Sequence, residues 1–507
     1  MTVSRRSLLL AGGAAALGAG LPRASVAVSG ETPLRRDVAT LIDPATGAWD
    51  PALHWYAKAV GWMKRQPVDR WDSWLFQAYT HGKPEAAPDD PPEWRQCPHG
   101  SPLFLPWHRW YVLRFERIVR RVIVEEFGRD DQAAWALPYW NYAHLGPDGD
   151  PGGSAGSRRV PLAFRQPYLP AAHGDAPEPN PLHLPSGDPA GRCLRDDEAM
   201  GWDIVAPDRA MAEPAFGPDE EGTDPRAGFS ATLELYPHGL VHDAVGGLLG
   251  AVPTAAQDPL FWLHHANVDR LWAAWLARPG HTLPEGQHWP GERPDHTGGT
   301  GRLPYLLRDE YGRRHLLTGP VFAFPDDAYR YDSLTDGTGT GAAPAAVLMA
   351  QPPRGGSPVA DSAGGVRLGD RQVVLPLEPV DALAGTSLAD ALDGDRRVVL
   401  TLDGVAADHP PCETFAVFLG GDTADTDTSG PAFVGHPVFF GAAARPGHGA
   451  AGDGRSFHFD VTGNLAALRA AGSASGRDVP AVRIVPGRGA VHEAAAPRIG
   501  AVRLTVV

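Results

Sequence analysis

The sequence is poor in cysteine, in lysine and in long apolar runs. Only three of its 507 residues are cysteines, too few for a disulfide framework, so at most one disulfide can form. Lysine occurs three times, and the net charge is −15, with no basic block beyond the first residues. Nucleic acid is therefore excluded as a partner, because phosphate binding needs clustered basic side chains. No segment after the N-terminus is long and apolar enough to predict a membrane span.

The N-terminus has the pattern of an export signal. Arg5 and Arg6 precede a short apolar stretch that is rich in alanine and glycine and runs to Leu21. This pattern predicts a twin-arginine signal peptide over residues 1–27, cleaved after Ala27, and hence an extracellular protein. The alternative is a protein without a signal, in which the two arginines are adjacent by chance.

The length and the composition predict two domains joined by a linker. We expect a catalytic domain at 28–335, a Gly/Pro/Ala linker at 336–368 and a C-terminal β domain at 369–507. The first domain contains two segments of helical periodicity, Trp107–Phe127 and Pro259–Leu276, with long loops over 146–228 between them. The last domain contains short runs typical of strands, at 396–402, 414–419, 481–485 and 501–507.

Histidines form two groups whose spacing suits metal binding. In the first group, His99 lies in a Gly/Pro loop and His108 in the helix that follows, with His81 upstream. In the second group, His238 and His242 are four residues apart and would project from one helix face. A third member, His265, lies on the later helix.

One helical turn after His265 comes Asp269, whose carboxylate is expected to reach a ring N–H and fix its tautomer. Histidine-only coordination without a bridging carboxylate argues against di-iron and hydrolytic dizinc centres and favours copper.

These residues resemble the two copper signatures of the tyrosinase, catechol oxidase and hemocyanin family. The first resemblance runs from His99 through Phe104-Leu-Pro-Trp-His108-Arg109 to Glu116, and the second from Asp258-Pro through Phe261 and His265 to Asp269. The family pattern excludes His264. The resemblance implies two copper ions, with dioxygen as co-substrate, and assigns as their ligands His81, His99 and His108, and His238, His242 and His265. It also implies a mainly α catalytic domain with a four-helix-bundle core, followed by a smaller β-sandwich-like domain.

Further matches extend the resemblance toward plant and fungal polyphenol oxidases. Arg35-Arg36 and Tyr329-Arg-Tyr331 are similar to motifs that begin and close their catalytic domain. The C-terminal domain is similar to the one that covers the copper site in latent members, so we expect it to shield the active site. In fungal relatives a cysteine is joined to a copper ligand by a thioether, which implies that Cys97 bonds to His99. An inert buried thiol is the alternative.

Substrate preference depends on a few residues near the second copper. In the family, a Glu and an Asn that hold a water are linked to hydroxylation of monophenols. Glu234 matches the Glu, but Gly239 stands where the Asn would be. We therefore expect oxidation of o-diphenols or o-aminophenols to o-quinones or quinone imines, with dioxygen reduced to water. Asp243 is either a base at the entrance or a solvated surface carboxylate, and Phe261 either packs behind the ligands or is ordinary core.

Two other functions stay open at this point. One is a tyrosinase with monophenol monooxygenase activity, which forms melanin-type pigments, and the other is a hemocyanin-like oxygen carrier. We expect a small phenolic substrate and no membrane partner. Nothing in the sequence demands a copper-delivery chaperone, although one is possible. The sequence does not determine the natural substrate, the oligomeric state or whether Cys193 and Cys412 pair.

Overall fold

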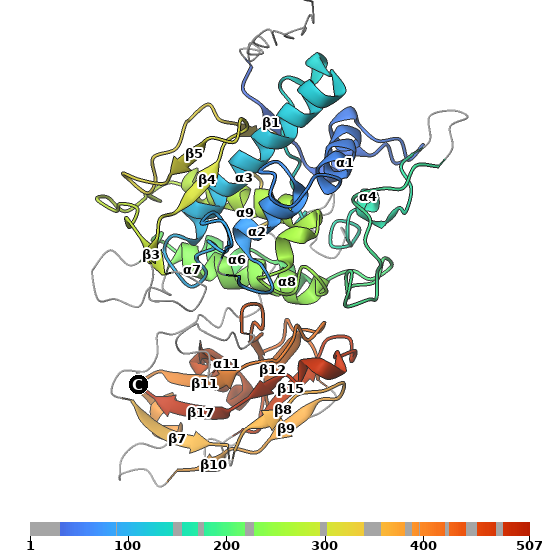
Figure 1. The fold of residues 1–507 in the computed structure, drawn as a ribbon. Coiled ribbons are helices and arrows are strands. Elements are labelled where there is room, and N and C mark those ends of the chain that lie inside the picture. Colours follow the sequence, from blue (N-terminus) through green and yellow to red (C-terminus); the bar gives the residue numbers. More distant parts are fainter. Residues whose placement is uncertain are drawn as a thin grey trace, which may run out of the picture.

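The computed structural model has two parts, one mainly helical and one built from strands, which meet along a broad interface (Figure 1). It describes residues 31–507 apart from 88, 145–154, 171–176, 218–227, 295–301, 339–355, 363, 381–387, 395, 421–424, 443–453 and 473–479. The predicted signal peptide and most of the predicted linker lie outside the described residues. Among the described residues, no helix has the length and apolar character needed to cross a membrane.

The longest helices among the described residues of the helical part are α1 (Pro51–Lys64), α2 (Trp74–His81), α3 (Phe104–Arg121) and α9 (Leu260–Leu276). Proline at the first position and the Asp50 side chain begin α1, and Ser73 caps α2 through the Phe76 N–H. Helix α3 packs against α9, and the rings of Phe115 and Trp262 stack with centroids 3.5 Å apart. This packing fixes the two helices that contain His108 and His265.

Both predicted helices exist, with small shifts at their ends. The first begins three residues earlier, at Phe104, and continues past Arg121 as a π-helical turn, η2 (Val122–Glu126). The second begins at Leu260, whose N–H is accepted by the Asp258 carboxylate at 2.8 Å. Shorter helices complete this part: η1 (Val38–Leu41), η3 (Asp130–Gln132), α4 (Leu162–Arg165), α5 (Trp202–Val205), α6 (Asp208–Met211), α7 (Phe229–Leu233), η5 (Glu234–Gly239), α8 (Leu240–Val245) and η6 (Ala255–Gln257).

Short strands border the helical part. Strand β1 (Leu34–Arg35) pairs in parallel with β6 (Arg330–Tyr331), which joins the start of the domain to its end. Two small antiparallel pairs, β2 (Arg293–Pro294) with β3 (Arg302–Leu303) and β4 (Leu306–Arg308) with β5 (Arg314–Leu316), lie between α9 and β6 in the sequence.

The second part consists of two antiparallel sheets with a shared apolar core. One sheet has the order β10-β7-β17-β11-β14 and the other β13-β12-β15-β9. Their strands are β7 (Ser357–Asp361), β9 (Val373–Leu375), β10 (Glu378–Pro379), β11 (Val398–Val405), β12 (Phe415–Leu419), β13 (Phe433–Gly435), β14 (Arg455–Asp460), β15 (Val482–Pro486) and β17 (Ala501–Val506). A small pair, β8 (Val366–Arg367) with β16 (Arg498–Ile499), and the helices α10 (Leu388–Asp393), α11 (Thr462–Ala470) and η7 (Glu493–Ala495) complete it.

The four strand runs predicted from the sequence correspond to β11, β12, β15 and β17. The predicted domain boundary is wrong, because β7 and β8 fall inside the stretch assigned to the linker. Strand β7 pairs with β17, so the C-terminal domain begins by Ser357 rather than at 369. Composition misled here because the first strand is flanked by Gly, Pro and Ser.

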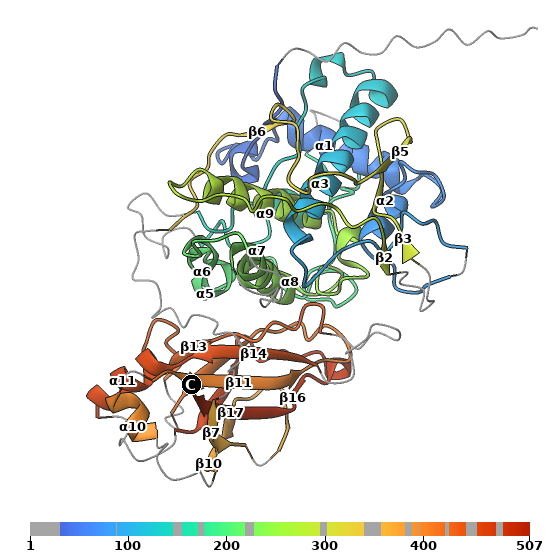
Figure 2. The same ribbon diagram turned by 90° about the vertical axis from the view of Figure 1, so that its left-hand side faces the viewer.

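The sheet domain lies against the face of the helical part that is formed by α5 to α8, as both views show (Figures 1 and 2). A disulfide between Cys193 and Cys412 joins the two parts, with the two Cα atoms 5.4 Å apart. Across the same interface, the Tyr236 hydroxyl donates to the His436 carbonyl at 2.7 Å, and His436 Nε2 lies 2.8 Å from an Asp203 carboxylate oxygen. The second part is therefore fixed on the helical part by covalent and polar contacts.

Candidate metal centre

The first group of histidines converges from two helices and a loop. His81 ends α2, His108 lies in the first turns of α3, and His99 lies on the loop that precedes α3. Their ring centroids are 5.4 to 5.8 Å apart. Together with Cys97 they form a group whose potential ligand atoms all lie within 4.8 Å of one another. The structure thus brings together three residues that span 28 positions of the sequence.

The second group lies on η5, α8 and α9. His238 and His242 have ring centroids 4.6 Å apart, and His265 lies 5.0 Å from His238. The two groups face each other, since the rings of His108 and His265 stack with centroids 4.3 Å apart. The sequence excluded His264, but its ring stacks on His238 at 5.3 Å and belongs to the same potential ligand group. Its exclusion as a ligand stays a prediction from the family pattern.

Backbone carbonyls orient four of the rings. Nδ1 of His81, His108, His238 and His242 lies 2.7 to 3.0 Å from the carbonyl oxygens of Val252, Phe104, Glu234 and Leu249. A carbonyl can only accept, so each Nδ1 carries the proton and donates it. This contact selects the tautomer in which Nε2 has the free electron pair that a metal requires.

The electrostatics of the site keep the histidines neutral. Burial, reinforced by neighbouring histidines, lowers the pKa of His108, His242 and His265 well below the ordinary range. Burial also lowers the pKa of His238 to about 3, although the Glu234 carbonyl opposes the shift. A neutral imidazole is the form that binds a metal, whereas a protonated one repels it. These rings are therefore in a metal-binding form at neutral pH.

The residues present fit a metal pair bound through imidazole nitrogen. Nε2 of His238, His242 and His265 is buried and has no hydrogen-bond partner, a costly state unless another group binds there. No Asp or Glu belongs to either histidine group among the described residues. Imidazole suits copper, zinc, iron and nickel, and the lack of bridging carboxylates disfavours hydrolytic dizinc and di-iron centres. The donor set therefore fits two copper ions.

Cys97 lies beside two of the candidate ligands. Its Sγ is 3.2 Å from Nδ1 of His99 and 3.3 Å from Nε2 of His108. The contact between Cys97 and His99 could be predicted, because the two residues are two positions apart in the sequence. The contact with His108 depends on the fold of the loop over α3, which the spacing alone does not give.

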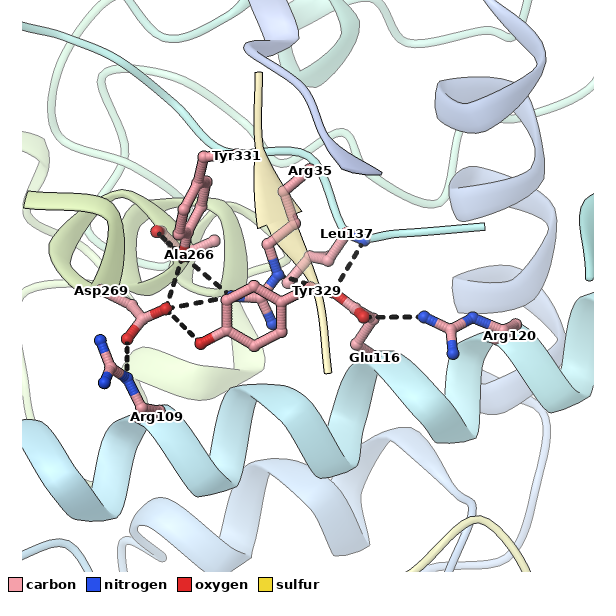
Figure 3. A network of polar contacts seen from close by, with 9 residues as sticks. All are labelled: Arg35, Arg109, Glu116, Arg120, Leu137, Ala266, Asp269, Tyr329 and Tyr331. Atoms are coloured by element: carbon pink, nitrogen blue, oxygen red, sulfur yellow. Dashed lines mark hydrogen bonds and ion pairs between the residues drawn. The ribbon is translucent and has the colours of Figure 1, made fainter. Parts of the chain in front are cut away.

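The expected contact between Asp269 and a ligand ring is wrong. The Asp269 carboxylate instead accepts from Arg109, Tyr329 and Tyr331 at 2.5 to 2.6 Å and from Arg35 at 3.3 Å (Figure 3). Nδ1 of His265 has no hydrogen-bond partner. The carboxylate extends away from the rings, toward the strand pair β1–β6, where its partners lie.

Asp269 belongs to a buried charge network that joins α3, α9 and both ends of the helical part (Figure 3). Arg35 is fully buried and also donates to Glu116 at 2.7 Å, while Glu116 accepts from Arg120 and from the Leu137 N–H. Burial raises the pKa of Asp269, but Arg109 and Arg35 lower it more, so the carboxyl stays ionised. The network holds the helices that contain His108 and His265 without touching their rings.

Two other carboxyls lie beside the second histidine group. Glu234 is buried and accepts the Gly100 N–H at 2.7 Å, which connects η5 to the loop of His99. Burial raises the pKa of Glu234 to about 7 and that of Asp243 to about 8. Asp243 is only 3% exposed, so the alternative of a solvated surface carboxylate is wrong. Both groups are covered because the C-terminal domain lies over them.

The phenylalanine singled out in the sequence lies against the ligand rings. The Phe261 ring is fully buried, with centroids 4.2 Å from His265 and 4.8 Å from His81. It therefore contacts rings of both histidine groups. Gly239 is also buried and lies directly against the C-terminal domain.

A segment of the C-terminal domain covers the histidines. The Phe440 ring stacks on His242 with centroids 3.8 Å apart and planes 7° apart, and lies edge-on to His99 and His238. The neighbouring Phe439 N–H donates to Asp243 at 2.7 Å, and Arg455 donates to the Phe440 carbonyl at 2.8 Å. These residues could not be predicted from the sequence, because they lie in a domain without a local motif and reach the site only through the fold.

The fold and the site bring together two adjoining histidine-rich groups that could hold metal ions. Residues 71–278 match the model of the common central domain of tyrosinase, and residues 358–505 match a domain of unknown function. Tyrosinase HcTyr1 of Hahella sp. (strain CCB-MM4) is 29% identical over 459 residues, covering 83% of this chain and 90% of that protein. Chloroplastic polyphenol oxidase of Spinacia oleracea is 30% identical over 257 residues, covering 44% of this chain but only 37% of the relative.

A solved structure shares the two-part fold. Latent aurone synthase, a polyphenol oxidase, aligns with a TM-score of 0.52 over 94% of this chain and 90% of its own, at 18% identity. Residues 71–278 therefore form a tyrosinase central domain, and the family of that domain uses a dicopper centre.

Proposed function

We propose that the protein oxidises o-diphenols or o-aminophenols with dioxygen. Two substrate molecules would each lose two electrons and two protons, giving two quinones or quinone imines, while one dioxygen becomes two water molecules. Two bound copper ions would supply the redox chemistry by taking electrons from the substrate and passing them to dioxygen. The observation that carries the proposal is the pair of facing histidine groups, in the second of which the buried Nε2 atoms of His238, His242 and His265 have no hydrogen-bond partner.

Each residue contributes through its place at the site. His81, His99 and His108 would hold one copper, and His238, His242 and His265 the other. Carbonyl contacts keep the rings in the binding tautomer, and Phe261 packs against the rings of both groups. Asp243 and Glu234 are the carboxyls positioned to accept a proton from the substrate hydroxyl. Removal of the cover would expose them to water and lower the pKa of both, which favours the ionised, basic form.

We also propose the thioether between Cys97 and His99. Formation of the bond would join Sγ to a ring carbon with loss of the thiol hydrogen and one ring hydrogen, a two-electron oxidation for which dioxygen is the oxidant. The contact of 3.2 Å between Sγ and the His99 ring supports it. A digest of the copper-loaded protein should contain the linked peptide two hydrogens lighter than its sequence. An unmodified peptide would contradict the bond.

The C-terminal domain is proposed to shield the site and keep the enzyme latent. Phe440 stacks where a phenolic ring would approach His242, and the solved aurone synthase that shares the fold is described as latent. The disulfide between Cys193 and Cys412 adds a second attachment besides the linker. Cleavage of the linker alone would therefore leave the cover in place, and release requires that a dithiol also reduce the disulfide.

The shielding proposal predicts how fast four preparations of the protein oxidise catechol. Intact protein and protein cut only in 339–355 should both oxidise catechol slowly. Protein that is cut and whose disulfide is also reduced should oxidise it fast. The Cys412→Ser variant should become fast after cutting alone. Equal rates for all four preparations would contradict the shielding function.

A tyrosinase activity is the second candidate, because the Hahella relative is named a tyrosinase and Glu234 is present. A hemocyanin-like oxygen carrier is the third. Oxygen uptake by copper-loaded, released protein on a monophenol, a catechol and an o-aminophenol separates the three. Fast oxidation of the last two with little monophenol uptake supports our proposal. Rapid monophenol uptake would make the protein a tyrosinase, and copper binding without turnover would favour the carrier.

Cellular location stays a prediction. Export by the twin-arginine route depends on residues 1–27, which lie outside the described residues. Edman sequencing of the secreted protein should begin at Val28 if cleavage follows Ala27.

A further inference from the structure

The glycine at position 239 is not required by the backbone. Gly239 has φ −62° and ψ −37°, the ordinary right-handed helical conformation that every residue except proline adopts readily. Glycine is costly in such a place, because it loses more conformational freedom on folding than alanine does. Another reason must therefore explain why no side chain is present directly after His238.

The C-terminal domain fills the space that a side chain would need. A Cβ built on Gly239 would lie 2.6 Å from Cγ1 of Val438 and 3.7 Å from its Cβ. The first distance is far inside van der Waals contact, whereas the second is ordinary. Glu234 contributes a milder contact, its carbonyl oxygen lying 3.2 Å away. The severe conflict is thus with one methyl group of another domain.

Val438 cannot easily move aside. It is 1% exposed, and branching at its Cβ restricts rotation of the valine side chain. The residues that follow it are held on the catalytic domain, since the Phe439 N–H donates to Asp243 and the Phe440 ring stacks on His242. A methyl group at position 239 would therefore push the whole covering segment away from the histidines.

We infer that Gly239 is a docking residue: its missing side chain makes room for Val438 and lets the C-terminal domain seat over the site. This inference rests on the proposed shielding function. It also changes how Gly239 is interpreted, because docking explains why no Asn stands at this position. The glycine by itself then gives no evidence against hydroxylation of monophenols. Substrate preference must then be tested on the released protein.

The test is hydrogen exchange in the full-length, metal-free protein. Gly239→Ala should speed exchange in the peptide that contains Val438, Phe439 and Phe440 by about tenfold, the usual scale for overpacking a tight contact. Gly463→Ala is the matched control, because it adds the same methyl to a helical glycine with nothing within 4 Å. Its exchange pattern should match that of the unaltered protein.

A second substitution isolates the contact. Val438→Ala removes Cγ1, so adding Gly239→Ala to it should change exchange by less than about twofold, the usual error of additivity. The same tenfold increase in both backgrounds would overturn the inference, as would no increase in the single variant. If Gly239→Ala alone does not fold, the double variant must fold, and failure of both would also overturn it.

An activity measurement separates this inference from the shielding proposal. The factor by which release speeds catechol oxidation should fall in Gly239→Ala and recover in the double variant. If the exchange results hold but the unaltered full-length protein is already fully active, the docking contact stands and the shielding function fails.

Discussion

Two buried aspartates beside the ligand helices have opposite environments. Asp269, on α9, is surrounded by two arginines and two tyrosines, and its pKa is lowered. Asp243, on α8, accepts a single hydrogen bond from the Phe439 N–H, and burial raises its pKa to about 8. The first has a full set of partners within the catalytic domain. The second is buried and accepts its hydrogen bond from another domain, which lies over it.

The difference separates two faces of the site. The permanent face is formed within the catalytic domain, and the removable face is formed by the C-terminal domain and leaves with it. On the side of Asp269, charges from both ends of the domain neutralise one another and fix α3 against α9 (Figure 3). On the side of Asp243, the C-terminal domain supplies Phe440 and Arg455. We therefore expect substitutions on the first side to change stability and substitutions on the second side to change access to the site.

The largest effect should come from Asp269→Asn. Removal of the charge leaves Arg109 buried without its anion and leaves Arg35 with one carboxylate, Glu116, in place of two, and breaking a buried ion pair typically costs about 3–5 kcal/mol. Denaturant unfolding of metal-free protein should show this loss. The same chemical change at Asp243 is the matched control. Equal losses for the two variants would contradict the comparison.

A smaller effect is expected at the removable face. Phe440→Ala should raise catechol oxidation by the full-length protein roughly fivefold, because it frees the approach to His242 while the disulfide and the remaining contacts keep the domain seated. Phe440→Leu keeps most of the bulk and should stay close to the unaltered protein. Initial rates of oxygen uptake give the answer. An alanine variant no faster than the leucine variant would show that Phe440 does not limit access.

For Asp243→Asn the expected effect on stability is smallest near pH 4 and grows as the pH rises. Burial raises the pKa of Asp243 from 3.8 to about 8, so the folded state keeps a proton that the unfolded chain releases near its ordinary pKa. Between these values the folded state binds more protons, and stability of the unaltered protein falls as pH rises.

Asparagine does not titrate, so the variant should match the unaltered metal-free protein near pH 4 and become relatively more stable toward pH 8. Denaturant unfolding curves measured from pH 4 to pH 8 test whether the relative stability of the variant rises with pH. A variant that loses relative stability as pH rises would show that the carboxyl is ionised under its cover.

The elements and residues that could be predicted from the sequence are those recognisable from spacing along a short stretch of chain. The helices around His108 and His265, four strands of the second domain and the six candidate ligands all follow from short patterns in the chain. The partners of Asp269 did not, because Arg35, Tyr329 and Tyr331 come from distant segments that meet only when β1 pairs with β6.

The interdomain contacts escaped prediction for the same reason. Pairing of Cys193 with Cys412 spans 219 residues, and the stacking of Phe440 on His242 depends on how one domain seats on the other. Gly239 was noticed as a departure from a motif, yet its contact with Val438 needs the fold. Spacing thus identified the candidate ligands, while the environment of each ligand required the structure.

The central claim is that the two histidine groups hold two copper ions, and copper content tests it most directly. Elemental analysis of copper-loaded protein should give two copper ions per chain, falling to about one when His238 and His242 are both replaced by alanine, since the first group stays intact. One copper or none in the unaltered protein, or two in the double variant, would contradict the account.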